Sequence, residues 1–165
     1  MKKLIILAVI AFSFSFANSQ AFLGEGDNKF QVGANIQDGG TGLNVSYDIG
    51  VGENISLGIS SSYVLGLNDT ITDAEFVDRL DVRARFNANL GNVINVDENF
   101  DIYPGLSFGL KNFGGHLGMR YFFSDGFGLY SEFNTPFAKY KSEDLTAAET
   151  LHNQFTVNIG MVFNL

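Results

Sequence analysis

Apolar and polar residues alternate with a period of two along most of the chain, and this pattern restricts the possible folds more than any other feature. The clearest run closes the sequence, where six apolar residues occupy every second position: Phe155, Val157, Ile159, Met161, Phe163 and Leu165. Val162 alone breaks the alternation. Successive side chains of a β-strand point to opposite faces, whereas a helix needs a period of 3.6, which the sequence does not sustain. The chain is therefore predicted to consist of strands with one apolar face.

Eight segments follow this pattern, at 30–36, 43–51, 55–63, 80–90, 102–110, 117–123, 127–137 and 155–165. Clusters of Gly, Asn and Asp predict turns at 38–42, 52–54, 91–99, 112–115 and 124–126. Two longer polar loops are expected at 66–75 and 138–152. Each neighbouring pair of strands is a candidate antiparallel hairpin. Because 165 residues fit one domain, the prediction is an all-β, antiparallel, up-and-down barrel of eight strands.

The first residues have the features of an export signal. Lys2 and Lys3 precede an apolar run over 4–12, and small residues follow it. An uncleaved membrane anchor is the alternative interpretation. Ser13 and Ser15 interrupt the run, however, which is shorter than the roughly 20 residues of a spanning helix.

We therefore expect a cleavable signal peptide over 1–20 and a barrel over 21–165. Cleavage after Ser19 and cleavage after Ala21 fit the small-residue rule equally well. Loss of two lysines makes the exported chain more acidic than the net charge of −8 of the whole sequence.

Composition excludes several classes of function. The absence of Cys excludes disulfides, thiolate zinc sites, a Cys nucleophile and a lipid-modified N-terminal cysteine. The net charge of −8 argues against a nucleic-acid partner. Charged residues make up 17% of the chain and aromatic residues 14%, so the composition is poor in charge for a soluble domain.

The apolar face of such strands points either inward, as in a soluble lipocalin-like carrier, or outward into lipid. The interior of an eight-stranded barrel is too narrow for most of the 17 Phe residues and the aliphatic side chains. The opposite face carries Gly, Ser, Asn and a few ions of both signs, which suits a packed interior better than a water-facing surface. Aromatic residues near segment ends could form an interfacial girdle, namely Tyr47, Tyr63, Tyr121, Phe123, Phe137 and Phe163. These features favour the lipid-facing arrangement.

With its signal peptide, eight amphipathic strands and a final strand FTVNIGMVFNL that runs to the last residue, the chain resembles the small eight-stranded outer-membrane barrels of the OmpA/OmpX type. The resemblance implies the outer membrane of a diderm bacterium, contact with outer-membrane lipid, and recognition of the C-terminal strand by the barrel-assembly machinery. It also implies periplasmic termini and periplasmic turns at 52–54 and 124–126. The segments 38–42, 66–75, 112–115 and 138–152 would then face outside, and 66–75 and 138–152 could contact an extracellular partner.

The alternation predicts which charged residues point into the barrel: Asp48, Arg79, Asp81, Arg83, Arg85, Asp101, Lys111, Arg120 and Glu132. Their charges nearly cancel, and we expect salt bridges among them because unpaired ions are costly away from water. If Gly58 lies opposite both Asp48 and Arg83, its missing side chain lets those two meet. A polar plug is favoured over a gated ion path.

Signals of catalysis are weak. The two histidines, His116 and His152, are expected near the external rim, and the loop beside them contains Ser142, Glu143, Glu149 and Thr150. No recognised Ser/His/acid motif and no H-E-x-x-H motif accompanies them. Asp69, Asp73 and Glu75 lack the spacing of a calcium loop, so a solvated acidic loop is the better interpretation.

No catalytic residue, cofactor or metal site is therefore predicted. We expect a structural or surface-interaction (adhesion or envelope) protein with a plugged interior. The alternatives are a narrow channel for ions or solutes, a rim-sited lipid-modifying enzyme and, less favoured, a soluble lipocalin-like carrier.

Overall fold

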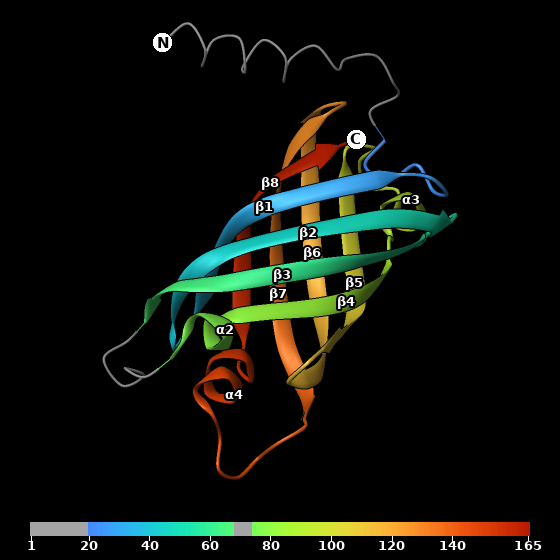
Figure 1. Ribbon diagram of the computed structural model, residues 1–165. Helices are drawn as coiled ribbons and strands as arrows, with labels where there is room; N and C mark the ends of the chain where they lie inside the picture. Colours follow the sequence, from blue (N-terminus) through green and yellow to red (C-terminus); the bar gives the residue numbers. More distant parts are fainter. Residues whose placement is uncertain (1–19, 68–73) are drawn as a thin grey trace, which may run out of the picture.

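The computed structural model describes residues 20–67 and 74–165, and these form a closed antiparallel β-barrel (Figure 1). Its strands follow one another around the ring in chain order, and the last pairs with the first. They are β1 (Asn28–Gln37), β2 (Gly40–Gly52), β3 (Ile55–Leu67), β4 (Leu80–Ala88), β5 (Phe100–Gly109), β6 (Asn112–Ser124), β7 (Phe127–Lys139) and β8 (Thr156–Asn164). The predicted all-β fold of eight up-and-down strands is confirmed. The segment 1–19, which holds most of the predicted signal peptide, lies outside the described residues.

Three short helices interrupt the described connections, α2 (Phe76–Arg79), α3 (Gly91–Ile94) and α4 (Ala147–His152). Sequence periodicity missed them because none exceeds six residues, which is too short for a helical repeat to emerge. None of the helices within 20–67 and 74–165 is long and apolar enough to cross a membrane.

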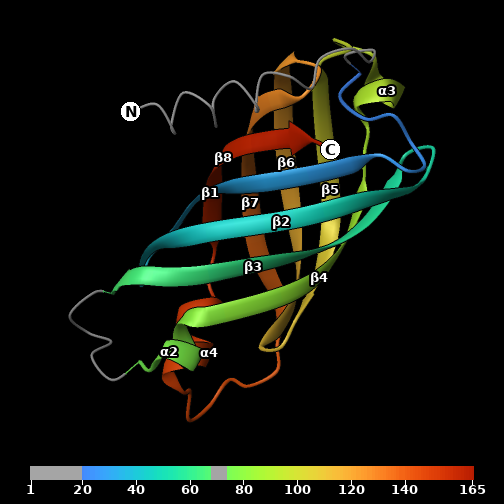
Figure 2. The same cartoon turned by 45° about the horizontal axis from the view of Figure 1, so that its top comes forward.

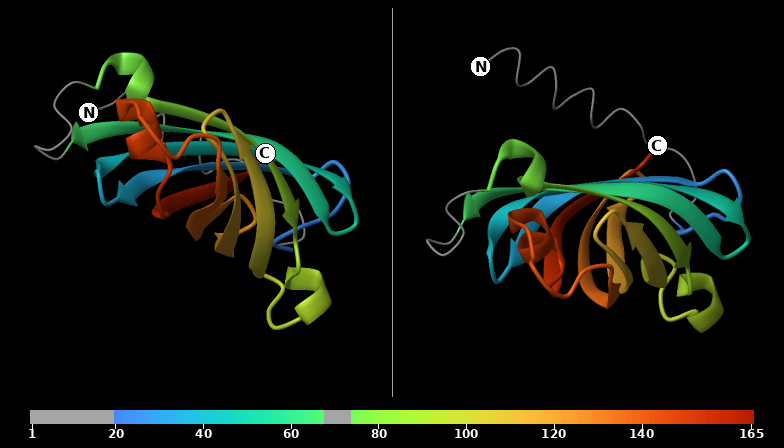
Figure 3. Two further views of the ribbon diagram at one scale, coloured as in Figure 1. Left: turned by 90° about the horizontal axis from the view of Figure 1, so that it is seen from below. Right: turned by 60° about the horizontal axis from the view of Figure 1, so that its bottom comes forward.

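The two mouths of the barrel differ (Figures 1 and 2). One mouth, here called the terminal mouth, holds the segment 20–27, the C-terminal Leu165, α3 and the turn between β6 and β7. The other, here called the capped mouth, is covered by α2 and α4, which pack against each other (Figure 3). All described interior groups therefore lie between an N-terminal segment and a pair of helices.

The predicted turns at 112–115 and 38–42 are wrong in position. The chain already turns at 110–111 and at 38–39, so 112–115 begins β6 and 40–42 begins β2. The glycines that suggested a turn have another use, because the ring of Phe137 lies against the position that a side chain of Gly115 would occupy. Glycine here provides room within a strand rather than a change of direction.

The apolar and polar faces of the strands point outward and inward, respectively. Ile59 on β3 is 61% exposed and Ile159 on β8 is 52% exposed, whereas Gln31 and Asn87 are fully buried inside the ring. In β8 the predicted outward residues Ile159 and Met161 are exposed, and so are Phe155 just before the strand and Leu165 just after it.

Val162, the residue that broke the sequence pattern, is buried inside the terminal mouth, where it packs with Ala21, Phe122 and Tyr130. This small cluster explains the exception in the sequence, because an apolar residue at an inward position has apolar neighbours there.

The pairing between β4 and β5 is the shortest in the ring. It joins only 83–87 to 105–109, whereas β1 and β8 pair from Lys29 to Gln37. Pro104 in β5 lies directly beside the last paired residue, Gly105, and it has no N–H that could extend the pairing with β4.

Candidate functional site

The barrel interior is the candidate functional site, and its centre is a buried ion-pair triad. Arg85 on β4 places its Nε 3.0 Å from Oδ1 of Asp48 on β2 and its Nη2 2.6 Å from Oε2 of Glu132 on β7. All three side chains are at most 2% exposed. Two carboxylates thus share one guanidinium, which explains how charges persist away from water.

Gly58 makes the contact between Asp48 and Arg85 possible. It lies opposite Asp48 on one side and opposite Arg85 on the other, and a side chain there would collide with Oδ1 of Asp48. The sequence prediction named the right glycine and the right acid but the wrong base. Arg83 lies opposite Ser60 instead, because the β3–β4 pairing is shifted by two residues from the predicted register.

Arg83 has its own partner near the capped mouth, Asp81 on the same face of β4, and its Nη2 also donates to the carbonyl oxygen of His152 at 3.2 Å. Two predicted interior residues lie elsewhere. Arg79 is in α2, where its Nε donates to the carbonyl oxygen of Ala74, and Lys111 is in the turn between β5 and β6. Both residues lie beyond the strand ends, where the inward–outward alternation no longer holds.

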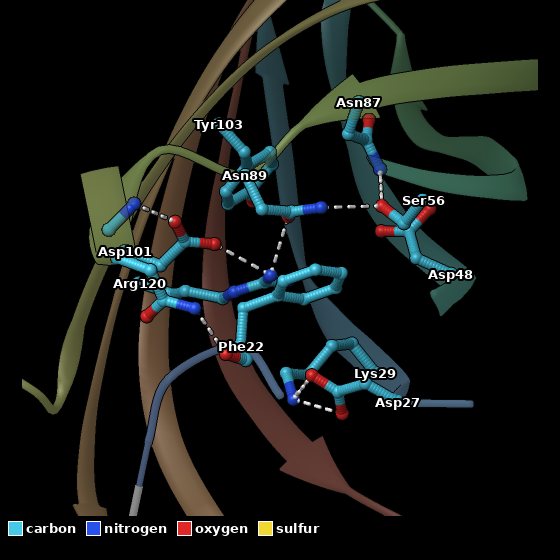
Figure 4. Close-up of polar contacts among 12 residues, drawn as sticks. Phe22, Asp27, Lys29, Asp48, Ser56, Asn87, Asn89, Asp101, Tyr103 and Arg120 are labelled. Carbon is cyan, nitrogen blue, oxygen red and sulfur yellow. Dashed lines mark hydrogen bonds and ion pairs between the residues drawn. The ribbon is translucent and has the colours of Figure 1, made fainter. Parts of the chain in front are cut away.

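A second buried ion pair joins Arg120 on β6 to Asp101 on β5 (Figure 4). Nη2 of Arg120 donates to Oδ2 of Asp101 at 2.7 Å and to Oδ1 of Asn89 at 2.8 Å. The guanidinium carbon lies 4.8 Å from the centre of the Tyr103 ring, a cation–π distance. Oδ1 of Asp101 accepts the backbone N–H of Gly91 at the start of α3.

The terminal mouth is filled by the segment 20–27 (Figure 4). Phe22 is 1% exposed, and its ring centre lies 5.9 Å from both the Lys29 ammonium and the Arg120 guanidinium carbon. Lys29 pairs with Asp27, while Nδ2 of Asn92 donates to the carbonyl oxygen of Phe22 at 2.8 Å. An aromatic ring between two cations thus closes this end.

The sequence prediction placed His116 near a rim, but it lies deep in the interior because β6 begins five residues earlier than expected. Its Nε2 lies 2.6 Å from Oδ1 of Asn87 and its Nδ1 2.8 Å from Oγ of Ser107. Since an amide oxygen only accepts, Nε2 carries the proton and Nδ1 accepts from Ser107. This Ser–His pair is buried and its polar atoms are used within the wall.

His152 belongs to the cover of the capped mouth. It ends α4, is 2% exposed, and its Nε2 donates to the carbonyl oxygen of Asp78 in α2 at 2.8 Å. Burial lowers the pKa of His152, so the neutral ring is favoured. Beside it, Leu151 packs on Val64 and Ala74.

The start of α4 is stabilised by a capping box. Thr146 accepts the N–H of Glu149, and the Glu149 carboxylate accepts the N–H and hydroxyl of Thr146. These bonds, foremost the one from the Thr146 backbone, lower the pKa of Glu149. Helices α2 and α4, which are joined by the hydrogen bond from His152 to Asp78, are here called the clasp of the capped mouth.

Beneath the clasp lies a polar cavity of about 20 Å³, which is enough for one water molecule. Asn35 and Asn134 each present to it a buried polar atom without a hydrogen-bond partner in the protein. Glu132 closes it towards the triad. The interior thus has room for water here.

Sequence reasoning missed several interior residues, namely Asp27, Lys29, Gln31, Tyr103 and Tyr130. Alternation counted back from Phe30 and Val32 would have found Lys29 and Gln31. Tyr103 was hidden because Pro104 interrupts its segment.

Within 20–67 and 74–165 no group of His, Asp and Glu is arranged to hold a metal ion. Asp69 and Asp73 of the acidic loop lie outside the described residues, and Glu75 caps α2.

These features define the class: a closed, up-and-down, eight-stranded β-barrel with an ion-paired polar interior. The chain belongs to a family of unknown function, DUF6646, whose model matches residues 12–165. No curated protein matches the sequence.

Proposed function

We propose that this protein is an outer-membrane β-barrel of a diderm bacterium, exported by a signal peptide, that serves as a structural or surface-interaction protein. The observation that carries the proposal is the inverted polarity of the barrel. Buried ions such as Arg85 and Arg120 fill the inside, while Leu43, Leu57 and Ile59 are about half exposed or more on the outside. Such a wall suits a lipid solvent, because closure pairs the last strand with the first and leaves no open sheet edge.

Aromatic residues are grouped near both ends of the outer wall, where interfacial girdles would lie. At the terminal mouth a chain of ring contacts joins Phe30, Phe163, Phe127, Phe123 and Tyr121. At the capped mouth, ring contacts join Phe108 to Phe113 and on to Phe137, and Tyr63 to Phe76. The outer-membrane lipid is thus the partner of the wall, and the exposed face of β8 is the part that the assembly machinery would recognise.

The closed interior supports a structural or surface role over a channel or an enzyme. Phe22 and Arg120 fill one end and the α2–α4 clasp covers the other. Both histidines are buried. What remains for a partner is the capped mouth, including the loop 140–146.

The first test is gel mobility of the membrane-extracted protein before and after boiling. A closed barrel in lipid resists detergent and shifts on heating. A shift is the expected result, whereas soluble protein without a shift would favour the lipocalin-like carrier.

Orientation is tested with epitope tags at two turns. A tag after Asp144 should be reached by antibody on intact cells, and a matched tag at the β6–β7 turn after Asp125 only after the outer membrane is permeabilised. The reverse pattern would place the capped mouth in the periplasm and remove it as a surface for extracellular partners.

A further inference from the structure

We infer that the exported chain is cut before Gln20, so that Ala21 and Phe22 stay in the protein as the closing plug of the terminal mouth. This inference rests on the proposed export. It decides between two cleavage positions, after Ser19 and after Ala21, that the small-residue rule leaves equal.

Ala21 is part of the folded barrel. It is 1% exposed and packs with Phe122, Tyr130 and Val162. Its backbone N–H donates to the carbonyl oxygen of Glu98 at 2.7 Å. Cleavage after Ala21 would remove this side chain and leave the Glu98 carbonyl without that donor.

Cleavage after Ala21 would also create a charge in an unfavourable place. The new α-ammonium would stand on Phe22, which is 1% exposed. Burying a charged amine is costly. Cleavage before Gln20 instead puts the ammonium on an exposed residue.

The loop 89–99 provides the receptor for the retained segment. Oδ1 of Asn92 accepts a hydrogen bond from Nε2 of Gln20 at 2.9 Å, and Nδ2 of Asn92 donates to the carbonyl oxygen of Phe22. The backbone N–H of Leu23 then donates to Oδ2 of Asp27 at 2.8 Å. One loop residue thus holds the segment on both sides of Ala21.

The test is the intact mass of the protein extracted from outer membranes. The expected species comprises 20–165. A species of 22–165 in a barrel that still shifts on heating would overturn the inference alone, whereas an unprocessed chain in the soluble fraction would overturn the proposed function.

Two variants separate the sites. Ala17→Arg spoils only the cut after Ser19, so the 20–165 species should disappear and precursor accumulate. Ala21→Val spoils only the cut after Ala21, so its product should still begin at Gln20. Normal processing of Ala17→Arg, or loss of processing in Ala21→Val, would overturn the inference.

A refolding comparison tests the plug without the peptidase. Chains 20–165 and 22–165 are folded into the same detergent micelles and titrated with urea. The longer chain should unfold at the higher urea concentration, and equal midpoints would overturn the inference.

Discussion

At the scale of single residues, Arg85 has a larger role than its neighbour Arg83. Arg85→Met leaves Asp48 and Glu132 buried and facing each other, whereas Arg83→Met leaves only Asp81. Removing one partner of a buried ion pair costs about 3–5 kcal/mol, so Arg85→Met should lower the unfolding free energy by at least that much. Urea titration in micelles measures it, with Arg83→Met as the matched control. Equal losses in the two variants would contradict the triad.

Gly58 can be tested in the same way. In Gly58→Ala the new methyl group meets Oδ1 of Asp48 and the carbonyl oxygen of Tyr47, so the barrel should lose about 1–3 kcal/mol, as overpacked sites do. Gly52→Ala is the control, because only the Ile55 side chain lies near its new methyl group. A Gly58→Ala barrel as stable as the Gly52→Ala barrel would show that the wall relaxes around the extra methyl.

Sequence reasoning at this scale works inside strands and fails at their ends. The alternation placed Asp48, Arg85 and Glu132 on the inward face, which is where they lie. It gave the wrong partner for Asp48 because the register between β3 and β4 depends on the length of their connection, which the residue pattern does not predict.

At the scale of elements, the α2–α4 clasp should weaken in acid. The folded-state pKa of His152 lies below its ordinary value of about 6.5, so the folded protein resists protonation and the unfolded chain binds the proton more readily. The stability is therefore present above pH 6.5 and is lost as pH falls below that value. Protease cleavage within 140–155 should be faster at pH 5 than at pH 7.5.

The variant His152→Gln isolates this contribution. Its amide keeps a donor for the Asp78 carbonyl but does not titrate. Its cleavage should vary less with pH than that of the parent protein, and an unchanged pH dependence would assign the effect to other groups.

The loop with α3 has two faces, and each makes different contacts. Asn92 and Glu98 hold the N-terminal segment, whereas Val93, Ile94 and Val96 are between 51% and 73% exposed. For a barrel in lipid, we expect these three side chains to lie in the membrane interface. Because the chain has no Trp, Val93→Trp gives a single probe that brominated lipids should quench. Glu143→Trp at the capped mouth is the control, and equal quenching of the two would contradict this placement.

None of the three described helices was predicted, and their sequences explain why. A segment such as Gly91–Ile94 forms one turn because its neighbours hold it: Gly91 donates to Asp101, and Asn92 reaches Phe22. Helices of this kind depend on tertiary contacts rather than on local propensity.

At the scale of the whole molecule, closure at several levels should prevent conduction. Planar bilayers containing the protein should show no current steps. Phe22→Ala should show none either, because the Arg120–Asp101 pair and the Arg85 triad still block the interior. Current steps of the Phe22→Ala protein that disappear when Arg85 is also substituted would identify a gated channel.

The pairing of β1 with β8 has a consequence for how the protein is made. These strands join Lys29 to Asn164, so the ring has two open edges until the last residues of the chain arrive. Open edges pair readily with other chains, and contacts of such long sequence separation form slowly. A nascent chain of this kind gains little from folding early. If the chain is exported as proposed, we expect its yield to depend on keeping these edges unpaired during transit more than on the stability of the finished barrel.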